Sequence, residues 1–284
     1  MIPLRDENPV LHRPYVTIAL ILINFVVFLI WEPGSGPWHQ TTEFEQTQFF
    51  YCHALVPYEV IHHTSLAEAR DLPPDGKEAV AQLQLDRACP HKSWLGSVFV
   101  SMFLHGGWLH ILGNMLFLWV FGNNVEDKLR APLYLLFYLA SGVAATLTQV
   151  ALIHSGVNAF VPNLGASGAI AGVLGAYLVM FPRRRVYTIV IFFVITAVYV
   201  PAFIVLGAWF VLQLFSGVGA LSQRVNSGGG VAVWAHIGGF AFGAALALLF
   251  FPKERFGARP PPPRPDLAPR RPWRNWGRRT RPWG

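Results

Sequence analysis

Long stretches almost free of charged residues alternate with polar segments along this chain. A helix needs about 20 apolar residues to cross the hydrocarbon core of a bilayer, and six stretches reach or approach that length. They are residues 14–31, 107–125, 132–154, 165–181, 201–221 and 231–251. The pattern predicts an all-α fold, a polytopic membrane domain of six spanning helices over residues 14–251.

Two further apolar segments adjoin these spans and make the apolar runs too long for single crossings. Residues 94–104 precede His105-Gly106-Gly107, which breaks the run, so we expect them to lie at or dip into the membrane interface. Residues 186–200 precede Pro201, which interrupts a helix, and we expect an interfacial or re-entrant piece there. The fifth span therefore has the least sharply defined limits.

Lys and Arg accumulate on one side of the predicted membrane. Residues 1–13, the Lys128/Arg130 loop and the 183–185 arginine cluster share that side, whereas the loop 32–93 carries nine acidic and four basic residues. Cytoplasmic loops are enriched in Lys and Arg, so we expect both termini in the cytoplasm and the 32–93 loop outside. No signal-peptide cleavage pattern follows the first span. The short N-terminus without a transit peptide favours a plasma membrane of the bacterial inner-membrane type.

Composition supports a membrane protein and locates the positive charge. Hydrophobic residues make up 53% of the chain and charged residues only 13%, against about a quarter in soluble domains. The net charge of +7 comes from residues 252–284, which hold ten of the 22 Lys and Arg residues. This Pro-rich segment is predicted to be a disordered cytoplasmic tail. Its Arg and Trp residues could bind anionic membrane lipid. A solvated tail that only fixes the membrane topology is the simpler interpretation. Nucleic-acid binding is not expected.

The two cysteines, Cys52 and Cys89, both lie in the predicted outer loop. A disulfide is expected if that loop faces an oxidising compartment. Two free thiols are the alternative. A small metal site with His53 and His91 is the third, and the spacing does not match a zinc motif. The sequence leaves these alternatives open and assigns the loop no role.

Four polar side chains from three predicted spans lie at one depth. Ser167 is the third residue of the fourth span and His236 the sixth of the last, so at ~1.5 Å per residue both lie within roughly 10 Å of the outer face. His110 and Asn114, four residues apart, share a face of the second span near that level. Polar groups inside a bilayer are costly and mark function by default.

A serine with an imidazole in reach is the minimum equipment for nucleophilic attack on a carbonyl. No acidic residue lies at this depth, so the pattern predicts a Ser–His dyad in which His236 takes the proton of Ser167. His110, Asn114 and the backbone N–H of Ser167 are the available oxyanion donors. Small residues around the dyad would let the helices pack closely; they are Gly165, Gly168, Gly172, Gly239 and Gly243.

Three motifs, in the same order along the chain, resemble those of the rhomboid intramembrane proteases. They are His105–Met115, Gly165–Gly172 and Ala235–Gly243, and the turn Gly122–Asp127 is similar as well. The resemblance implies a six-helix bundle around a water-filled cavity open to the outer face. It implies single-pass membrane proteins as substrates, cut in or near their spans, and no metal or soluble cofactor.

The resemblance also implies residue roles. Ser167 would be the nucleophile and His236 the general base, with His110 and Asn114 stabilising the oxyanion. The loop 155–164 would cap the cavity, and substrate would enter past residues 186–221. This chain departs from the family's pattern in lacking a Trp-Arg pair in the first loop and in having Ala171 where many members have a tyrosine that supports the histidine ring.

Three other classes of protein compete with this interpretation. A membrane metalloprotease is disfavoured because the chain lacks a His-Glu-x-x-His motif. A transporter would show corresponding interrupted helices in two halves, and no such repeat is evident. A catalytically silent rhomboid-like protein that binds membrane clients is the main alternative; such proteins typically lack the serine or the histidine, and this chain has both. The natural substrate and the oligomeric state are not encoded in any recognisable pattern.

Overall fold

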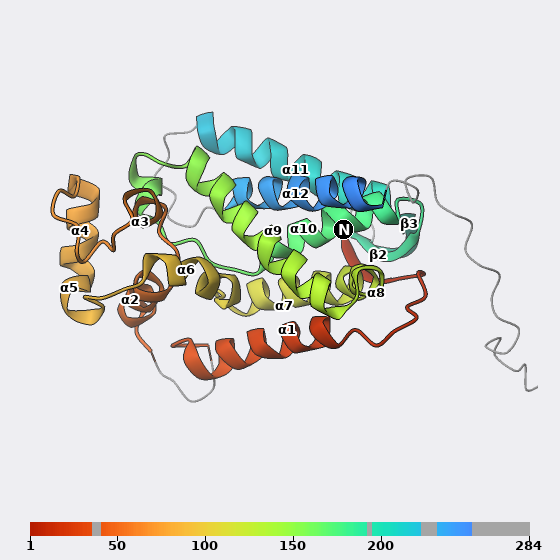
Figure 1. Cartoon of the computed structure of the whole chain (residues 1–284), viewed down its shortest axis with the longest axis horizontal. Helices are drawn as coiled ribbons and strands as arrows, with labels where there is room; N and C mark the ends of the chain where they lie inside the picture. Colours follow the sequence, from red (N-terminus) through yellow and green to blue (C-terminus); the bar gives the residue numbers. More distant parts are fainter. Residues whose placement is uncertain (36–40, 192–194, 223–231, 252–284) are drawn as a thin grey trace, which may run out of the picture.

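The computed structural model describes residues 1–35, 41–191, 195–222 and 232–251, and a helix lies at each of the six predicted spans (Figure 1). These helices are α1 (Tyr15–Val26) continued by the π-helix η1 (Val27–Trp31), α7 (Trp108–Phe117) continued by η3 (Leu118–Gly122) and α8 (Asn123–Leu129), α9 (Ala131–Leu152), α10 (Ser167–Met180), α11 (Ala202–Ser222) and α12 (Val233–Phe250).

Not every one of these helices is long enough by itself to cross a bilayer. Among the described residues, α9 and α12 combine the required length and hydropathy. The segments Trp94–Phe103 and Trp108–Leu129 meet that requirement together, but the chain bends by 80° between them. Helices α1, α10 and α11 are apolar and shorter in their described parts. The structure thus gives two or three candidate spans, and the count of six stays a prediction.

Helix α10 forms the centre of the bundle and packs against both α9 and α12, which also contact each other (Figure 1). Its residues from Gly168 to Tyr177 are all buried. A methyl group at Gly239 of α12 would collide with the carbonyl oxygen of Gly168, and one at Gly243 would collide with that of Gly172. Because these positions carry no side chain, the backbones of α10 and α12 approach closely, as small residues permit in helical membrane proteins.

The all-α prediction is wrong for one part of the chain. The described residues of 186–200, expected as an interfacial or re-entrant piece, belong instead to two antiparallel strands, β2 (Arg185–Ile191) and β3 (Ile195–Pro201). The N-terminal strand β1 (Ile2–Asp6) pairs with β2, which gives an antiparallel sheet of order β1-β2-β3. The segment is rich in Val, Ile, Thr and Tyr, the residues that favour strands, so the structure is mostly helical with one small sheet.

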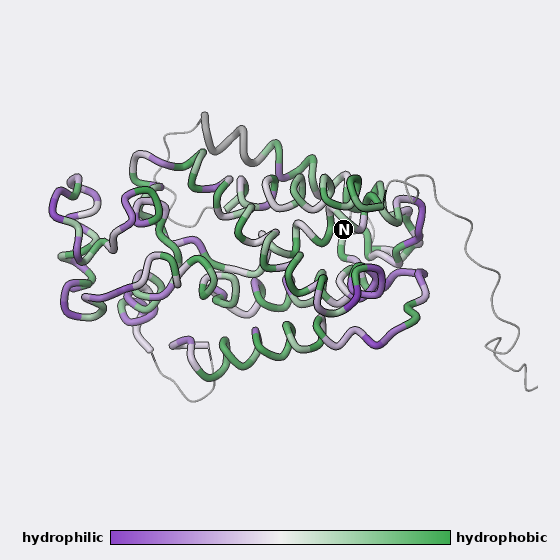
Figure 2. The backbone as a smooth tube through the Cα atoms, in the orientation of Figure 1, coloured by the Kyte–Doolittle hydropathy of each residue, from purple (hydrophilic) through white to green (hydrophobic). Residues whose placement is uncertain are grey.

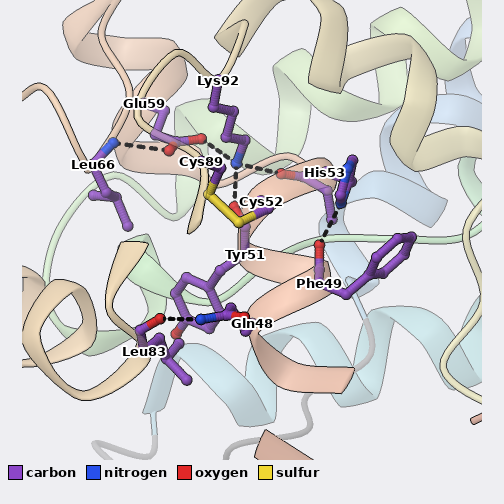
Figure 3. The surroundings of a disulfide bond; sticks show 11 residues. Gln48, Phe49, Tyr51, Cys52, His53, Glu59, Leu66, Leu83, Cys89 and Lys92 are labelled. Carbon is purple, nitrogen blue, oxygen red and sulfur yellow. Dashed lines mark hydrogen bonds and ion pairs between the residues drawn. A yellow bond between two sulfur atoms is a disulfide. The ribbon is translucent and has the colours of Figure 1, made fainter. Parts of the chain in front are cut away.

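A hydrophilic subdomain, residues 41–93, lies at the end of the bundle opposite the sheet (Figures 1 and 2). Its helices are α2 (Glu43–His53), α3 (Pro57–His62), α4 (Pro74–Leu83) and α5 (Leu85–Ala88), and α6 (Trp94–Val100) with the 3-10 helix η2 (Ser101–Phe103) follows it. Cys52 and Cys89 form a disulfide, which decides between the alternatives left open by the sequence (Figure 3). The described residues contain no cluster of metal ligands.

A buried ion pair holds the subdomain together beside the disulfide. Lys92 Nζ lies 2.6 Å from Glu59 Oε2 and donates to the carbonyls of Tyr51 and Ala54, each at 2.7 Å (Figure 3). Burial raises the pKa of Glu59 and lowers the pKa of Lys92, and the pairing of the two charges opposes both shifts. A buried charge is tolerated only when it is paired and hydrogen-bonded, and here both conditions are met.

The 41–93 subdomain is fastened to the segment that leads into α10. The backbone N–H of Asn163 donates to the carbonyl of Leu55 at 2.7 Å. The ring of Phe160, in the short helix η4 (Val157–Phe160), stacks on Tyr58 with centroids 4.9 Å apart. The segment 157–164 therefore runs from the subdomain directly to the start of the central helix. The predicted tail, residues 252–284, and most of the predicted loop 222–230 lie outside the described residues.

Candidate active site

The side chains of Ser167 and His236 meet at the end of the bundle nearest the 41–93 subdomain. Ser167 is the first residue of α10, and His236 lies in the first turn of α12. The distance between Ser167 Oγ and His236 Nε2 is 2.7 Å, which is a hydrogen bond. The close approach of α10 and α12 at Gly168 and Gly239 brings the two side chains within this reach.

The second nitrogen of the imidazole has a partner that the sequence analysis missed. His236 Nδ1 lies 3.0 Å from Oε1 of Gln213, a residue of α11. The ring of Trp209, one turn earlier on α11, lies 5.8 Å from the imidazole centroid. Ala171, the residue noted in the sequence as a departure, is fully buried and offers only a methyl group. Helix α11 therefore supplies the contact to Nδ1, whereas Ser167 of α10 contacts Nε2.

His110 lies beside the peptide segment that precedes the serine. Gly165 has φ +120°, a conformation that a side chain strains, and a methyl group there would come within 2.8 Å of His110 Nε2. Glycine at position 165 thus permits both the positive φ and the close approach of the His110 ring. The ring of His105 packs edge-on against the ring of His110, with the two centroids 5.1 Å apart. The backbone N–H of His105 donates a hydrogen bond to Glu32 Oε1 at 2.9 Å.

Asn114 presents a hydrogen-bond donor with nothing bound to it. The side chain is buried, with 9% of its surface exposed, and within the described part of the chain its Nδ2 has no hydrogen-bond partner. Leaving a buried donor unpaired costs about 1–3 kcal/mol. This cost is accounted for if the oxygen of a ligand accepts a hydrogen bond from Asn114 Nδ2.

A small cavity of about 40 Å³ lies behind the serine. A cavity holds a water molecule when it offers more than roughly 10–15 Å³ and several polar partners. The lining includes the polar side chains of Ser101, Thr146, Gln149, Asn163 and Ser167. The cavity beside Ser167 is therefore large enough and polar enough to hold a water molecule.

The assembled groups are of the types that acyl transfer uses. They comprise a hydroxyl bonded to an imidazole, an amide oxygen behind that imidazole, an unpaired amide donor and room for water. The hydroxyl and the imidazole lie at the distance that a nucleophile and its base require. The five glycines predicted to allow close packing all lie at tight contacts around this site. Gly165 packs against His110. Gly168 packs against Ala145 and Gly239, and Gly172 packs against Ser141 and Gly243.

Comparison with known proteins gives a family match over the same part of the chain. The rhomboid domain matches residues 92–253, which include Ser167 and His236. The chain is 27% identical over 168 residues to RHOMBOID-like protein 1 of Arabidopsis thaliana, which is 59% of this chain and 37% of that protein. It is 37% identical over 148 residues to Rhomboid protease GluP of Bacillus subtilis, 51% of this chain and 25% of that protein.

A third relative is Rhomboid protein 1, mitochondrial, of Saccharomyces cerevisiae. It is 36% identical over 91 residues, which is 32% of this chain and 26% of that protein. The matches thus span between 25% and 37% of the lengths of these three relatives. The relatives include plant, bacterial and mitochondrial proteins, so the matches indicate a membrane protein without indicating which membrane it occupies.

Proposed function

Since this chain belongs to the rhomboid family, we propose that it is an intramembrane serine endopeptidase that cleaves single-pass membrane proteins in or near their spans. The observation that carries the proposal is the 2.7 Å hydrogen bond between Ser167 Oγ and His236 Nε2, inside a bundle of apolar helices. A polar pair of this kind is costly to bury and is retained where it is used.

In the proposed reaction Ser167 attacks the scissile carbonyl while His236 Nε2 takes its proton. The charge that develops on the carbonyl oxygen would be stabilised by Asn114 Nδ2, His110 and the backbone N–H of Ser167. His236 then gives the proton to the leaving amine, and the peptide bond breaks to leave an acyl group on Ser167. A water molecule deprotonated by His236 hydrolyses this ester and restores the serine.

The membrane arrangement is part of the proposal. All six apolar helices would span the bilayer, with both termini in the cytoplasm and the 41–93 subdomain outside. That orientation puts Lys and Arg on the cytoplasmic side and the Cys52–Cys89 disulfide in an oxidising compartment. A plasma membrane of the bacterial inner-membrane type is the location that fits both.

The alternative is a catalytically silent rhomboid-like protein that binds membrane clients. The unpaired Asn114 donor and the bonded Ser167–His236 pair favour an enzyme, since a binding protein has no use for an activated serine. A fluorophosphonate probe tests the choice, because it labels only a serine with an active base. We expect labelling of the wild type and none of Ser167→Ala or His236→Ala. A wild type that stays unlabelled would support the silent protein.

A further inference from the structure

Gln213 is a polar residue in an apolar helix, and its side chain turns toward the site. Helix α11 presents large apolar side chains on its outer surface, including Val211 and Phe215, which are 47% and 74% exposed. Gln213 is partly buried, and its Oε1 lies 3.0 Å from His236 Nδ1. A glutamine amide in an apolar environment is costly unless it is hydrogen-bonded, so this contact explains why the side chain turns inward.

The chemistry of the two contacts of the imidazole fixes its tautomer. An amide oxygen only accepts hydrogen bonds, so the proton of the neutral ring must be on Nδ1. Nε2 then carries a lone pair and accepts the hydrogen bond from Ser167 Oγ. In the opposite tautomer Nε2 would carry hydrogen and could not take the serine proton. Only the first arrangement is competent for nucleophilic attack.

We propose that Gln213 is a positioning residue, which holds His236 in the tautomer and orientation that activate Ser167. The proposal rests on the proposed protease function and deepens it. It assigns to an amide the task that a carboxylate performs in a three-membered catalytic arrangement. Gln213 touches neither the substrate nor the reacting atoms; it acts through His236.

The position of Gln213 on α11 couples this helix to catalysis. About one turn before Gln213 on α11, Phe210 stacks on Phe240 of α12 with centroids 4.4 Å apart, and Trp209 lies against His236. These contacts seat α11 on α12 at the outer edge of the bundle (Figure 1). The Gln213–His236 hydrogen bond is thus one of several contacts that join α11 to α12.

Three variants separate positioning from general packing. Gln213→Leu places an apolar side chain at this position and removes the acceptor. Gln213→Glu keeps an accepting oxygen whether or not it is ionised. Val211→Leu is the matched control, because it changes an exposed apolar position two residues away. Each protein, in detergent or nanodiscs, is treated with a small fluorophosphonate, and the second-order rate of Ser167 labelling is measured.

We expect Gln213→Leu to label about tenfold more slowly, the effect of losing one hydrogen bond that is made to a reacting group. Gln213→Glu and Val211→Leu should label close to the wild-type rate. In cleavage assays the loss for Gln213→Leu should be in kcat rather than in KM. A wild-type labelling rate in Gln213→Leu would overturn the proposal. So would equal losses in Gln213→Leu and Gln213→Glu, which would indicate packing alone.

A second measurement reads the tautomer in the wild type and does not depend on activity. Nitrogen-15 NMR of the imidazoles, with His236 assigned by its absence in His236→Ala, reports which ring nitrogen carries hydrogen. We expect Nδ1–H for His236 in the wild type, and a protonated Nε2 there would contradict the proposal. If the wild type shows Nδ1–H and yet Ser167 is neither labelled nor active, the protease function fails while the positioning contact stands.

Discussion

The disulfide of the 41–93 subdomain offers a perturbation whose size follows from the structure. Cys52 and Cys89 are 37 residues apart, and closing a loop of that length removes enough chain entropy from the unfolded state to stabilise the fold by about 4 kcal/mol. The subdomain has a small apolar core of Val56, Leu66, Leu72 and Leu85, which Ala159 and Phe160 of η4 complete. Small cores of this kind depend on a crosslink.

We expect the double variant Cys52→Ser/Cys89→Ser to lose the stability of this subdomain while the helical bundle stays folded. Proteolysis of a transiently open segment follows the population of its open form. A loss of about 4 kcal/mol therefore raises the cleavage rate within residues 41–93 by up to about 10³-fold. Limited proteolysis followed by mass analysis of the fragments measures this rate.

The matched control is a thiol reductant applied to both proteins. It should accelerate cleavage of the wild type to the rate of the double variant and leave the double variant unchanged. A double variant that resists protease as well as the oxidised wild type would refute the reasoning, because the loop entropy would then contribute nothing to the fold. Simultaneous loss of the helical bundle would show that the subdomain and the bundle are one folding unit.

Two further predictions concern single side chains. Asn114→Ala should lower turnover by about 10²–10³ with little change in KM, since an oxyanion donor acts in the transition state; unchanged turnover would remove Asn114 from that role. Burial raises the pKa of Asp6 to about 6, although the Tyr177 hydroxyl opposes this. The folded state then binds the proton more tightly than the unfolded state, so attachment of β1 should be strongest below about pH 4 and weaken as the pH rises through 6. Hydrogen exchange of the β1 amides should show this trend in the wild type and not in Asp6→Asn.

The helices of the bundle could be predicted because their length and apolar composition are local properties. Spacing also pointed to close packing, since Gly168 and Gly172 face Gly239 and Gly243 as small-residue pairs do. The depth of Ser167 and His236 followed from residue counts along two spans. Depth gives only the axial position, however. The 2.7 Å contact also needs the rotation of α10 and α12 about their axes, which packing decides.

The sheet and Gln213 could not be predicted, for different reasons. An apolar run rich in β-branched residues, such as Arg185–Ile191, has no period that separates a strand from a buried helical segment. Its pairing with β1 joins residues that are at least 180 positions apart, such as Asp6 and Val186. Gln213 is a single polar residue with no motif around it, and its partner His236 lies 23 residues later on another helix. Only the packing of α11 on α12 brings the two together.

The central claim is that Ser167 and His236 form the dyad of a protease that acts in the membrane. Its most direct test is the protein reconstituted in liposomes with a single-span substrate, with the wild type compared with Ser167→Ala and His236→Ala. We predict that the wild type cuts the substrate in or near its span and that neither variant does, although both remain folded. Cleavage at the same site by Ser167→Ala would contradict the account.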